Sequence, residues 1–102
     1  MAIQPLVLQE VANHIIGLID HAIVTIDDVQ IDHEIYRNSI EDNVLKTFVY
    51  VDNEEGTITD VRLVDTLGRP LNLQEMHIEK GPDGLIFVFK ITLLIQTEIE
   101  GG

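Results

Sequence analysis

The chain has 102 residues, 45% of them hydrophobic and 5% aromatic, and its 18 acidic and 6 basic side chains give a formal charge of −12. This length predicts a single domain over residues 1–102 with an aliphatic core. The charge excludes a basic footprint for nucleic-acid phosphates or anionic lipid. The absence of cysteine excludes disulfides and thiolate chemistry. No uncharged apolar run approaches the ~20 residues of a membrane span, so no membrane partner is expected.

Residues 6–19, "LVLQEVANHIIGLI", are predicted to form a helix. Pro5 precedes them at a position that a first helical turn tolerates. A short helix with one apolar stripe must lie against a sheet or a partner. The stripe has the helical spacing of Leu8, Val11, Ala12, Ile15, Ile16 and Ile19.

The period changes to two after residue 20, which predicts a β-rich body over about residues 21–100. Residues 21–26 and 29–35 alternate, and between them Asp27 and Asp28 either make a tight reversal or continue one long strand. Residues 37–43, "RNSIEDN", are expected to be a polar loop. Strands follow at 44–51 and 57–64, separated by "DNEEG", in which Gly56 is available for a positive φ.

Two further turns are predicted in the second half of the chain. Asp65 and Gly68 occupy the first and fourth places of a type I turn, with Gly68 free to take the left-handed conformation that closes a hairpin. The second turn is "KGPDG", residues 80–84, formed by Pro82 and Gly84. We therefore expect an α+β, mainly β fold, in which one N-terminal helix is followed by antiparallel hairpins forming a sheet or a sandwich.

The last predicted strand, residues 85–100, is unusually long. Its 16 residues would span about 50 Å at ~3.3 Å each, whereas a compact domain of this length has a radius of gyration near 13 Å. The strand must therefore bend sharply or project. A projecting apolar strand exposes an edge that pairs with another chain, so the sequence predicts self-assembly or docking into a larger structure.

The polar residues do not form a recognisable catalytic or ligand set. The four histidines are scattered without metal-ligand spacing, and "DNEEG" resembles only half of a calcium loop. Asp28, Asp32 and Glu34 would share one face of a regular strand, which is typical of a solvated face as well as of an acid–base pair. The sequence therefore predicts no catalytic, cofactor-binding or metal-binding residue and no enzymatic activity.

Residues 58–71, "ITDVRLVDTLGRPL", consist of a strand, an Asp-x-x-Gly turn and a second apolar strand. This hairpin, with the N-terminal helix, the polar middle and the closing strand "GLIFVFKI", resembles small tail, baseplate and fibre-attachment proteins of tailed bacteriophages. The likeness covers about residues 8–95. It rests on Ile58, Asp60, Val61, Leu63, Asp65, Gly68 and Leu71, and Asp60 stands where the family has glutamate.

The resemblance implies a non-enzymatic virion structural protein, made in the bacterial host cytoplasm and working through contacts with other tail and baseplate proteins. We expect a homo-oligomer, a trimer or a ring. An alternative is a stand-alone β module that binds carbohydrate or calcium through its acidic loops, and a small enzyme comes third. The predicted assembly contacts are Val11, Ile15, Ile91, Leu93 and Ile95.

Overall fold

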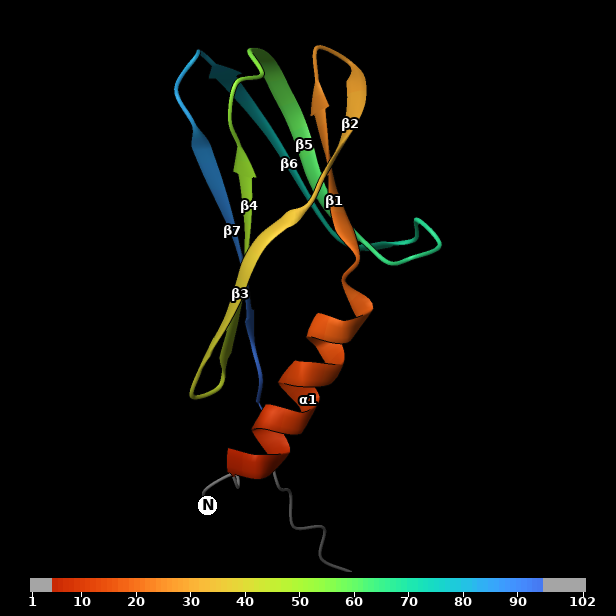
Figure 1. Cartoon of the computed structure of the whole chain (residues 1–102), viewed down its shortest axis with the longest axis vertical. Coiled ribbons are helices and arrows are strands. Elements are labelled where there is room, and N and C mark those ends of the chain that lie inside the picture. Colours follow the sequence, from red (N-terminus) through yellow and green to blue (C-terminus); the bar gives the residue numbers. More distant parts are fainter. Residues whose placement is uncertain (1–4, 95–102) are drawn as a thin grey trace, which may run out of the picture.

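The computed structural model describes residues 5–94 and shows one helix followed by seven antiparallel strands (Figure 1). This confirms the predicted fold class, mainly β with an N-terminal helix. The helix begins and ends within one residue of the predicted range. The elements are α1 (Pro5–Leu18), β1 (His21–Ile26), β2 (Val29–His33), β3 (Ile35–Glu41), β4 (Val44–Val51), β5 (Gly56–Val64), β6 (Pro70–Lys80) and β7 (Leu85–Thr92).

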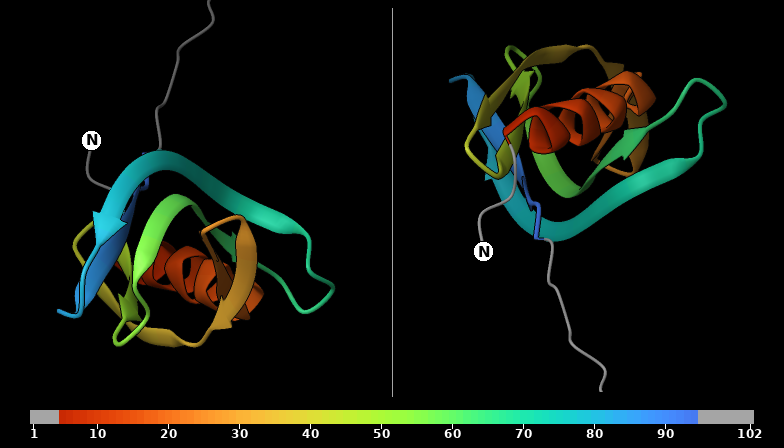
Figure 2. Two further views of the ribbon diagram at one scale, coloured as in Figure 1. Left: turned by 90° about the horizontal axis from the view of Figure 1, so that it is seen from above. Right: turned by 90° about the horizontal axis from the view of Figure 1, so that it is seen from below.

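The strands form two sheets that pack as a sandwich. Sheet A has the order β2-β1-β5-β6 and sheet B the order β3-β4-β7. Hairpins join β1 to β2, β3 to β4 and β5 to β6, while the three remaining connections cross from one sheet to the other. Seen along the long axis in Figure 2, the strands surround the core and α1 lies at one end.

The reversal between β1 and β2 is a two-residue turn. Asp27 and Asp28 have φ values of 50° and 65°, as a type I′ hairpin turn requires. The Asp27 amide donates to the carbonyl of Thr57, and the Thr57 amide donates to Asp27 Oδ1, each at 2.9 Å. Gly56 lies beside this turn with a φ of 143°, and a Cβ there would overlap the side chains of Asp27 and Ile26. Of the two interpretations of residues 21–35, the tight reversal is therefore correct.

The prediction of a polar loop over residues 37–43 is wrong. Residues up to Glu41 belong to β3, and only Asp42 and Asn43 form the turn into β4. The polar residues of this segment suggested a loop, but the side-chain oxygen of Asn38 accepts a hydrogen bond from the hydroxyl of buried Thr47 at 2.7 Å. An inward-facing amide with a hydrogen-bond partner is compatible with a strand.

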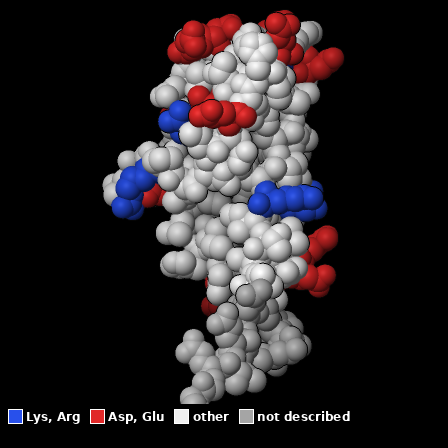
Figure 3. Space-filling view, turned by 180° about the vertical axis from the view of Figure 1, so that it is seen from behind, with Lys and Arg blue, Asp and Glu red and all other residues white. Residues whose placement is uncertain are grey.

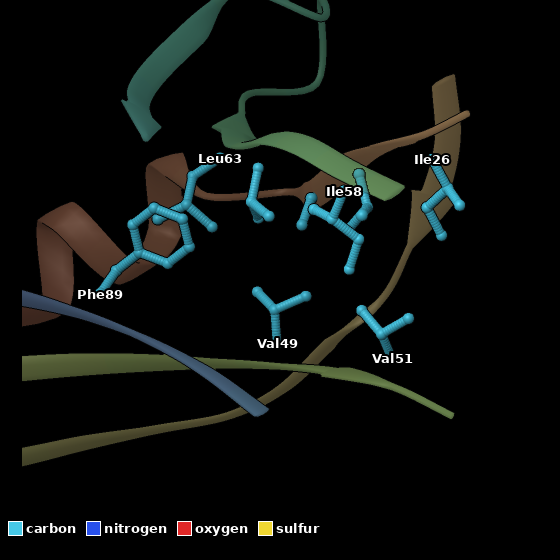
Figure 4. Close-up of a cluster of buried hydrophobic side chains, with 9 residues drawn as sticks. Ile26, Val49, Val51, Ile58, Leu63 and Phe89 are labelled. Atoms are coloured by element: carbon cyan, nitrogen blue, oxygen red, sulfur yellow. The ribbon is translucent and has the colours of Figure 1, made fainter. Parts of the chain in front are cut away.

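The core is aliphatic and lies between the two sheets, as Figure 4 shows. Its buried side chains come from the inner faces of β1, β4, β5 and β7, where alternate residues of each strand point inward. They are Ala22, Val24, Ile26, Val49, Val51, Ile58, Val61, Leu63 and Phe89.

The turn between β5 and β6 is organised by Asp65. Its Oδ1 accepts from the amides of Leu67 and Arg69, both at 2.9 Å, and its Oδ2 from Arg69 Nε at 2.6 Å. Gly68 has a φ of 78°, and its amide donates to the Asp65 carbonyl. The backbone hydrogen bond from Arg69, followed by the other Arg69 and Leu67 contacts, holds the pKa of Asp65 below its usual value.

The second predicted turn, with Pro82 and Gly84, carries the chain from β6 in sheet A to β7 in sheet B. Gly84 is needed here for space, since a Cβ on it would overlap the phenol ring of Tyr50. Within the described part of the chain, no helix is long and apolar enough to cross a membrane.

The molecule is elongated, with extents of 58 × 27 × 25 Å and a radius of gyration of 16.7 Å, against about 13 Å for a compact domain of this length. β7 ends at Thr92. Leu93 continues its pairing for one step, because its amide donates to the carbonyl of Asn43 at 2.8 Å and its carbonyl accepts from Asn43 Nδ2 at 3.1 Å. Residues 95–100 of the predicted strand lie outside the described residues.

Candidate assembly surface

The outer face of sheet B carries apolar, aromatic and basic side chains together. β4 and β7 pair so that Tyr50 lies across from Ile86, Phe48 from Val88 and Lys46 from Lys90. Directly opposite residues of an antiparallel pair share one face. β3 adds two more side chains at the margin of β4. We call this surface the basic sheet face, formed by Tyr36, Arg37, Lys46, Phe48, Tyr50, Ile86, Val88 and Lys90.

Contacts within the basic sheet face order its aromatic rings. The rings of Tyr36 and Tyr50 have centroids 5.8 Å apart at 47°, and the guanidinium of Arg37 lies 4.3 Å from the centroid of Phe48. The Tyr50 hydroxyl donates to Asp52 Oδ1 at 3.3 Å. The negative charge of Asp52 is the main cause that raises the pKa of Tyr50. The result is a partly ordered apolar surface that remains open to solvent, with Tyr36 60% exposed.

Half of the basic residues are held by contacts elsewhere in the chain. Arg62 pairs with Asp60 at 3.2 Å, and Arg69 pairs with Asp65. The ammonium of Lys80 is buried and donates to three backbone carbonyls, those of Asp52, Glu54 and Gly81, at 2.6, 2.7 and 3.0 Å.

The other three basic residues, of the six in the sequence, all lie on the basic sheet face. Arg37, Lys46 and Lys90 form no ion pair with any residue that the structure describes. Because the whole chain has a net charge of −12, these cations are not part of a general basic surface. The face therefore suits a partner that is both apolar and anionic.

A group of acidic residues lies at one end of the sandwich, the tip, where the β1–β2, β4–β5 and β6–β7 connections meet (Figure 1). Figure 3 shows acidic side chains there and basic ones nearer the middle of the molecule. Inside the tip, His33 Nε2 lies 2.9 Å from Glu54 Oε1 and its Nδ1 lies 3.1 Å from the carbonyl of Ile31. The exposed carboxylates are those of Asp27, Asp28, Asp52, Glu55 and Asp83.

The "DNEEG" loop at the tip is closed by protein donors. Lys80 donates hydrogen bonds to the backbone carbonyls of Asp52 and Glu54. The Tyr50 hydroxyl is hydrogen-bonded to the Asp52 carboxylate, and the His33 ring is hydrogen-bonded to the Glu54 carboxylate. Several oxygens that a calcium ion would need are thus already engaged, whereas Glu54 Oε2 is buried without a hydrogen-bond partner among the described residues.

The histidines and carboxylates considered for chemistry do not converge. His14 is exposed on α1, His21 lies at the start of β1 and His77 is exposed on β6, while His33 lies near the tip. Among the described residues, no three His, Cys, Asp or Glu side chains are placed to hold a metal ion. Asp28 is in a turn rather than on a strand face with Asp32 and Glu34.

The opposite end of the molecule contains an apolar hollow of about 240 Å³ between α1 and the ends of β5, β6 and β7. Two predicted assembly contacts, Ile15 and Ile91, line it together. Val11 is 42% exposed on α1, and Leu93 is partly buried just beyond β7. Ile95 lies outside the described residues. The other lining residues are Leu18, Ile19, Leu63, Leu71 and Asn72.

A groove of about 360 Å³ runs between β6 and β7. These strands are neighbours in the chain but lie at the edges of different sheets. On its open side, neither strand has a partner strand among residues 5–94. The groove is lined by Asn72, Gln74, Glu75, Met76, Phe87, Val88, Phe89 and Lys90.

Sequence reasoning missed the basic sheet face. Alternation already placed Lys90 on the outward side of its strand, and the same holds for Lys46 in residues 44–51. Their meeting depends on the pairing of β4 with β7 in the register that runs from Val44↔Thr92 to Val51↔Leu85, which alternation within one strand does not reveal.

No family model matches this chain, and neither a curated protein nor a solved structure shows significant similarity to it.

Proposed function

We propose that this chain is a non-enzymatic structural protein that acts through protein–protein assembly, in the tail, baseplate or fibre-attachment region of a phage or phage-tail-like particle. The observation that carries the proposal is the placement of Arg37, Lys46 and Lys90 on one apolar sheet face of a chain whose charge is −12. Cations left without ion pairs among the described residues, beside exposed aromatic rings, favour an interface over a solvated surface.

The apolar end near α1 supports the same proposal. Leu18 and Leu71 are exposed beside the hollow that Ile15 and Ile91 line, and Leu6 is exposed at the start of α1. Large apolar side chains gathered at one end of a small domain commonly mark a contact with another protein. The basic sheet face would select an acidic partner, and the apolar end would add buried area.

The assignment to a phage particle is supported by the resemblance of residues 58–71 to tail and baseplate proteins. In the fold, Asp65 and Gly68 shape the β5–β6 turn, and the other residues of the motif belong to strands. Every one of them has a part in the sandwich, which suits a protein that works by shape.

A tagged chain expressed in the bacterium that produces the particles tests the proposal. Arg37→Gln/Lys46→Gln should lower the amount of tagged chain that co-sediments with purified particles by about tenfold, since it removes charges expected at the centre of the interface. Gln30→Glu/Asn53→Asp changes the net charge equally at exposed sites and should leave co-sedimentation unchanged. A wild-type chain that never enters the particle fraction would refute the proposal.

A carbohydrate-binding module is the second candidate, favoured by one observation. Tyr36 and Tyr50 border an open hollow of about 620 Å³ that is also lined by Asp32, His33 and Glu54, whose polar atoms could bind hydroxyls. Calorimetric titration with host cell-wall oligosaccharides tests this reading. Saturable binding that is lost in Tyr36→Ala, with particle association unaffected, would favour the module.

A further inference from the structure

The free edge of β7 has backbone groups ready to pair. The Leu93 amide and carbonyl both face Asn43 at the end of β4. Backbone direction alternates along an antiparallel strand. The N–H and C=O groups of Val88, Lys90 and Thr92 therefore point away from β4, toward the open side of the sheet. An unpaired edge of this kind is a template for another strand.

The groove beside this edge offers an apolar floor. Phe87 and Phe89 line it from β7, and Met76 lines it from β6. A strand added along β7 would place alternate side chains over these residues, on the inner side of the sheet. Its remaining side chains would lie on the outer side, next to Lys90 and the basic sheet face.

Residues 95–100, "IQTEIE", have the pattern that such a strand needs. Ile95, Thr97 and Ile99 alternate with Gln96, Glu98 and Glu100, so one face is apolar and β-branched while the other is polar and acidic. The segment joins β7 through Leu93 and Leu94. No Gly, Pro, Asn or Asp occurs between residues 91 and 100, so the sequence offers no turn that would fold it back onto its own β7.

We propose that residues 95–100 of a second copy of the chain add as an antiparallel strand to the free edge of β7. The inference rests on the proposed assembly function and names one partner, the chain itself. Because residue 95 follows directly from the β7 region, antiparallel addition is reciprocal: each copy gives its segment to the other. The product is a closed two-fold dimer, a different unit from the trimer or ring expected from sequence.

A register that pairs odd residues with odd ones satisfies both the backbone and the side chains, and we propose the one centred on Leu93. It places Ile95 across from Ile91, Thr97 from Phe89 and Ile99 from Phe87, and Leu93 meets its own copy at the two-fold axis. In this register, odd-numbered residues lie opposite odd-numbered ones and even-numbered residues opposite even-numbered ones. The outward-pointing backbone groups of Val88 and Lys90 therefore meet those of Glu98 and Gln96. A shift by one residue would turn the isoleucines to the solvent side.

Charge favours strand addition in a register of this kind. Glu98 lies across from Val88 and diagonal to Lys90, a distance that long side chains bridge. Lys46 is directly opposite Lys90 on the neighbouring strand, so an incoming acidic strand meets two cations. The addition therefore supplies anions to the face whose cations have no ion pair within residues 5–94.

Sedimentation equilibrium of the full chain tests the proposal. The wild-type chain is expected to dimerise, and Ile95→Asn/Ile99→Asn should raise the dissociation constant at least on the order of a hundredfold, because two side chains of each copy lose their apolar burial. Gln96→Asn/Glu100→Asn is the matched control on the other face and should retain the dimer. A dimer that survives the isoleucine changes, or a wild-type chain that is monomeric at all concentrations, overturns the proposal.

Exchanging the charges of residues 90 and 98 between two chains tests whether these residues lie near each other across the dimer interface. Lys90→Glu and Glu98→Lys should each weaken the homodimer roughly threefold to tenfold, since each places like charges near one another. An equal mixture of the two variants should form a heterodimer of wild-type affinity, because both contacts are then complementary. A mixture that associates no better than either variant alone contradicts the proposed register.

The outcomes separate this inference from the proposed function. If the isoleucine variant is monomeric but still co-sediments with particles, the dimer is real and is not needed for particle association. If the wild-type chain enters particles as a monomer, the dimer is refuted and the assembly function stands.

Discussion

The two ends of this molecule are packed differently. Toward the tip, Val24, Val51 and Ile58 are fully or almost fully buried between the sheets, and Lys80 joins the loops through three backbone carbonyls. At the other end, Ala12 is the one buried side chain among residues 6–18 of α1. Leucines there are exposed, and a hollow separates the helix from the strands.

The difference indicates a division of labour within one small domain. The buried core cluster between the two sheets contains no residue of α1, so we expect the helix to contribute less to stability. The helix and the end of β7 can then keep apolar side chains available for partners, at little cost to folding. We therefore expect that substitutions near the tip lower the free energy of unfolding. Substitutions at the helix end should instead weaken association with partner proteins.

Ile58→Ala should have the largest effect on stability. Ile58 is 0% exposed in the middle of the core, and replacing a buried isoleucine by alanine costs about 2–5 kcal/mol through lost burial and a cavity. Urea unfolding monitored by circular dichroism measures it. The control Leu67→Ala, in the exposed β5–β6 turn, should change stability by less than about 0.5 kcal/mol. Equal effects of the two changes would contradict the proposed division.

Lys80→Met should have the second-largest effect and lower the free energy of unfolding by about 2–3 kcal/mol. The reason is that three backbone carbonyls lose their hydrogen bonds to the buried ammonium group. The β4–β5 loop should also loosen, which hydrogen exchange of its amides would detect. Exposed Lys90→Met is the control and should leave stability nearly unchanged. Unaltered exchange in the loop would show that Lys80 does not organise the tip.

The tip-side fold was largely predictable from sequence. Period-two alternation identified most of the strands, and turn chemistry identified the reversal at Asp65 and gave the one at Asp27 as one of two interpretations. The polar loop prediction failed because residue type alone did not reveal that Asn38 would find Thr47. Which strands share a sheet also stayed hidden, since β4 and β5 follow each other in the chain yet lie in different sheets.

The candidate surface was less predictable for the same reason. The chosen contacts Ile15 and Ile91 meet at one hollow, but Lys46 and Lys90 become neighbours only through β4–β7 pairing. Long-range pairing sets where surface residues meet, whereas local pattern sets only which side of a strand they occupy.

Lowering the pH should remove the contribution of the Asp65 carboxylate to the stability of the folded chain. Its pKa is lowered in the folded chain, chiefly by the backbone amide of Arg69, so its stabilising effect is present above the pKa of an unfolded aspartate and is lost as the pH falls through the lower, folded value. The difference in melting temperature between wild type and Asp65→Asn should therefore shrink between roughly pH 5 and pH 1. A difference that is constant across this range would show that the carboxylate charge has no part in the turn.

Val11→Ala should have the smallest effect on stability and should separate the two ends most clearly. Val11 is 42% exposed on α1, and alanine has the higher helix propensity, so the variant should be as stable as wild type or more stable by up to about 0.5 kcal/mol. Association with particles should nevertheless weaken, because an apolar contact with the partner is lost. His14→Ala, exposed on the same helix, gains similar propensity and should not affect association. If Val11→Ala instead lowers stability and leaves association intact, α1 belongs to the folding core and the helix end is not an interface.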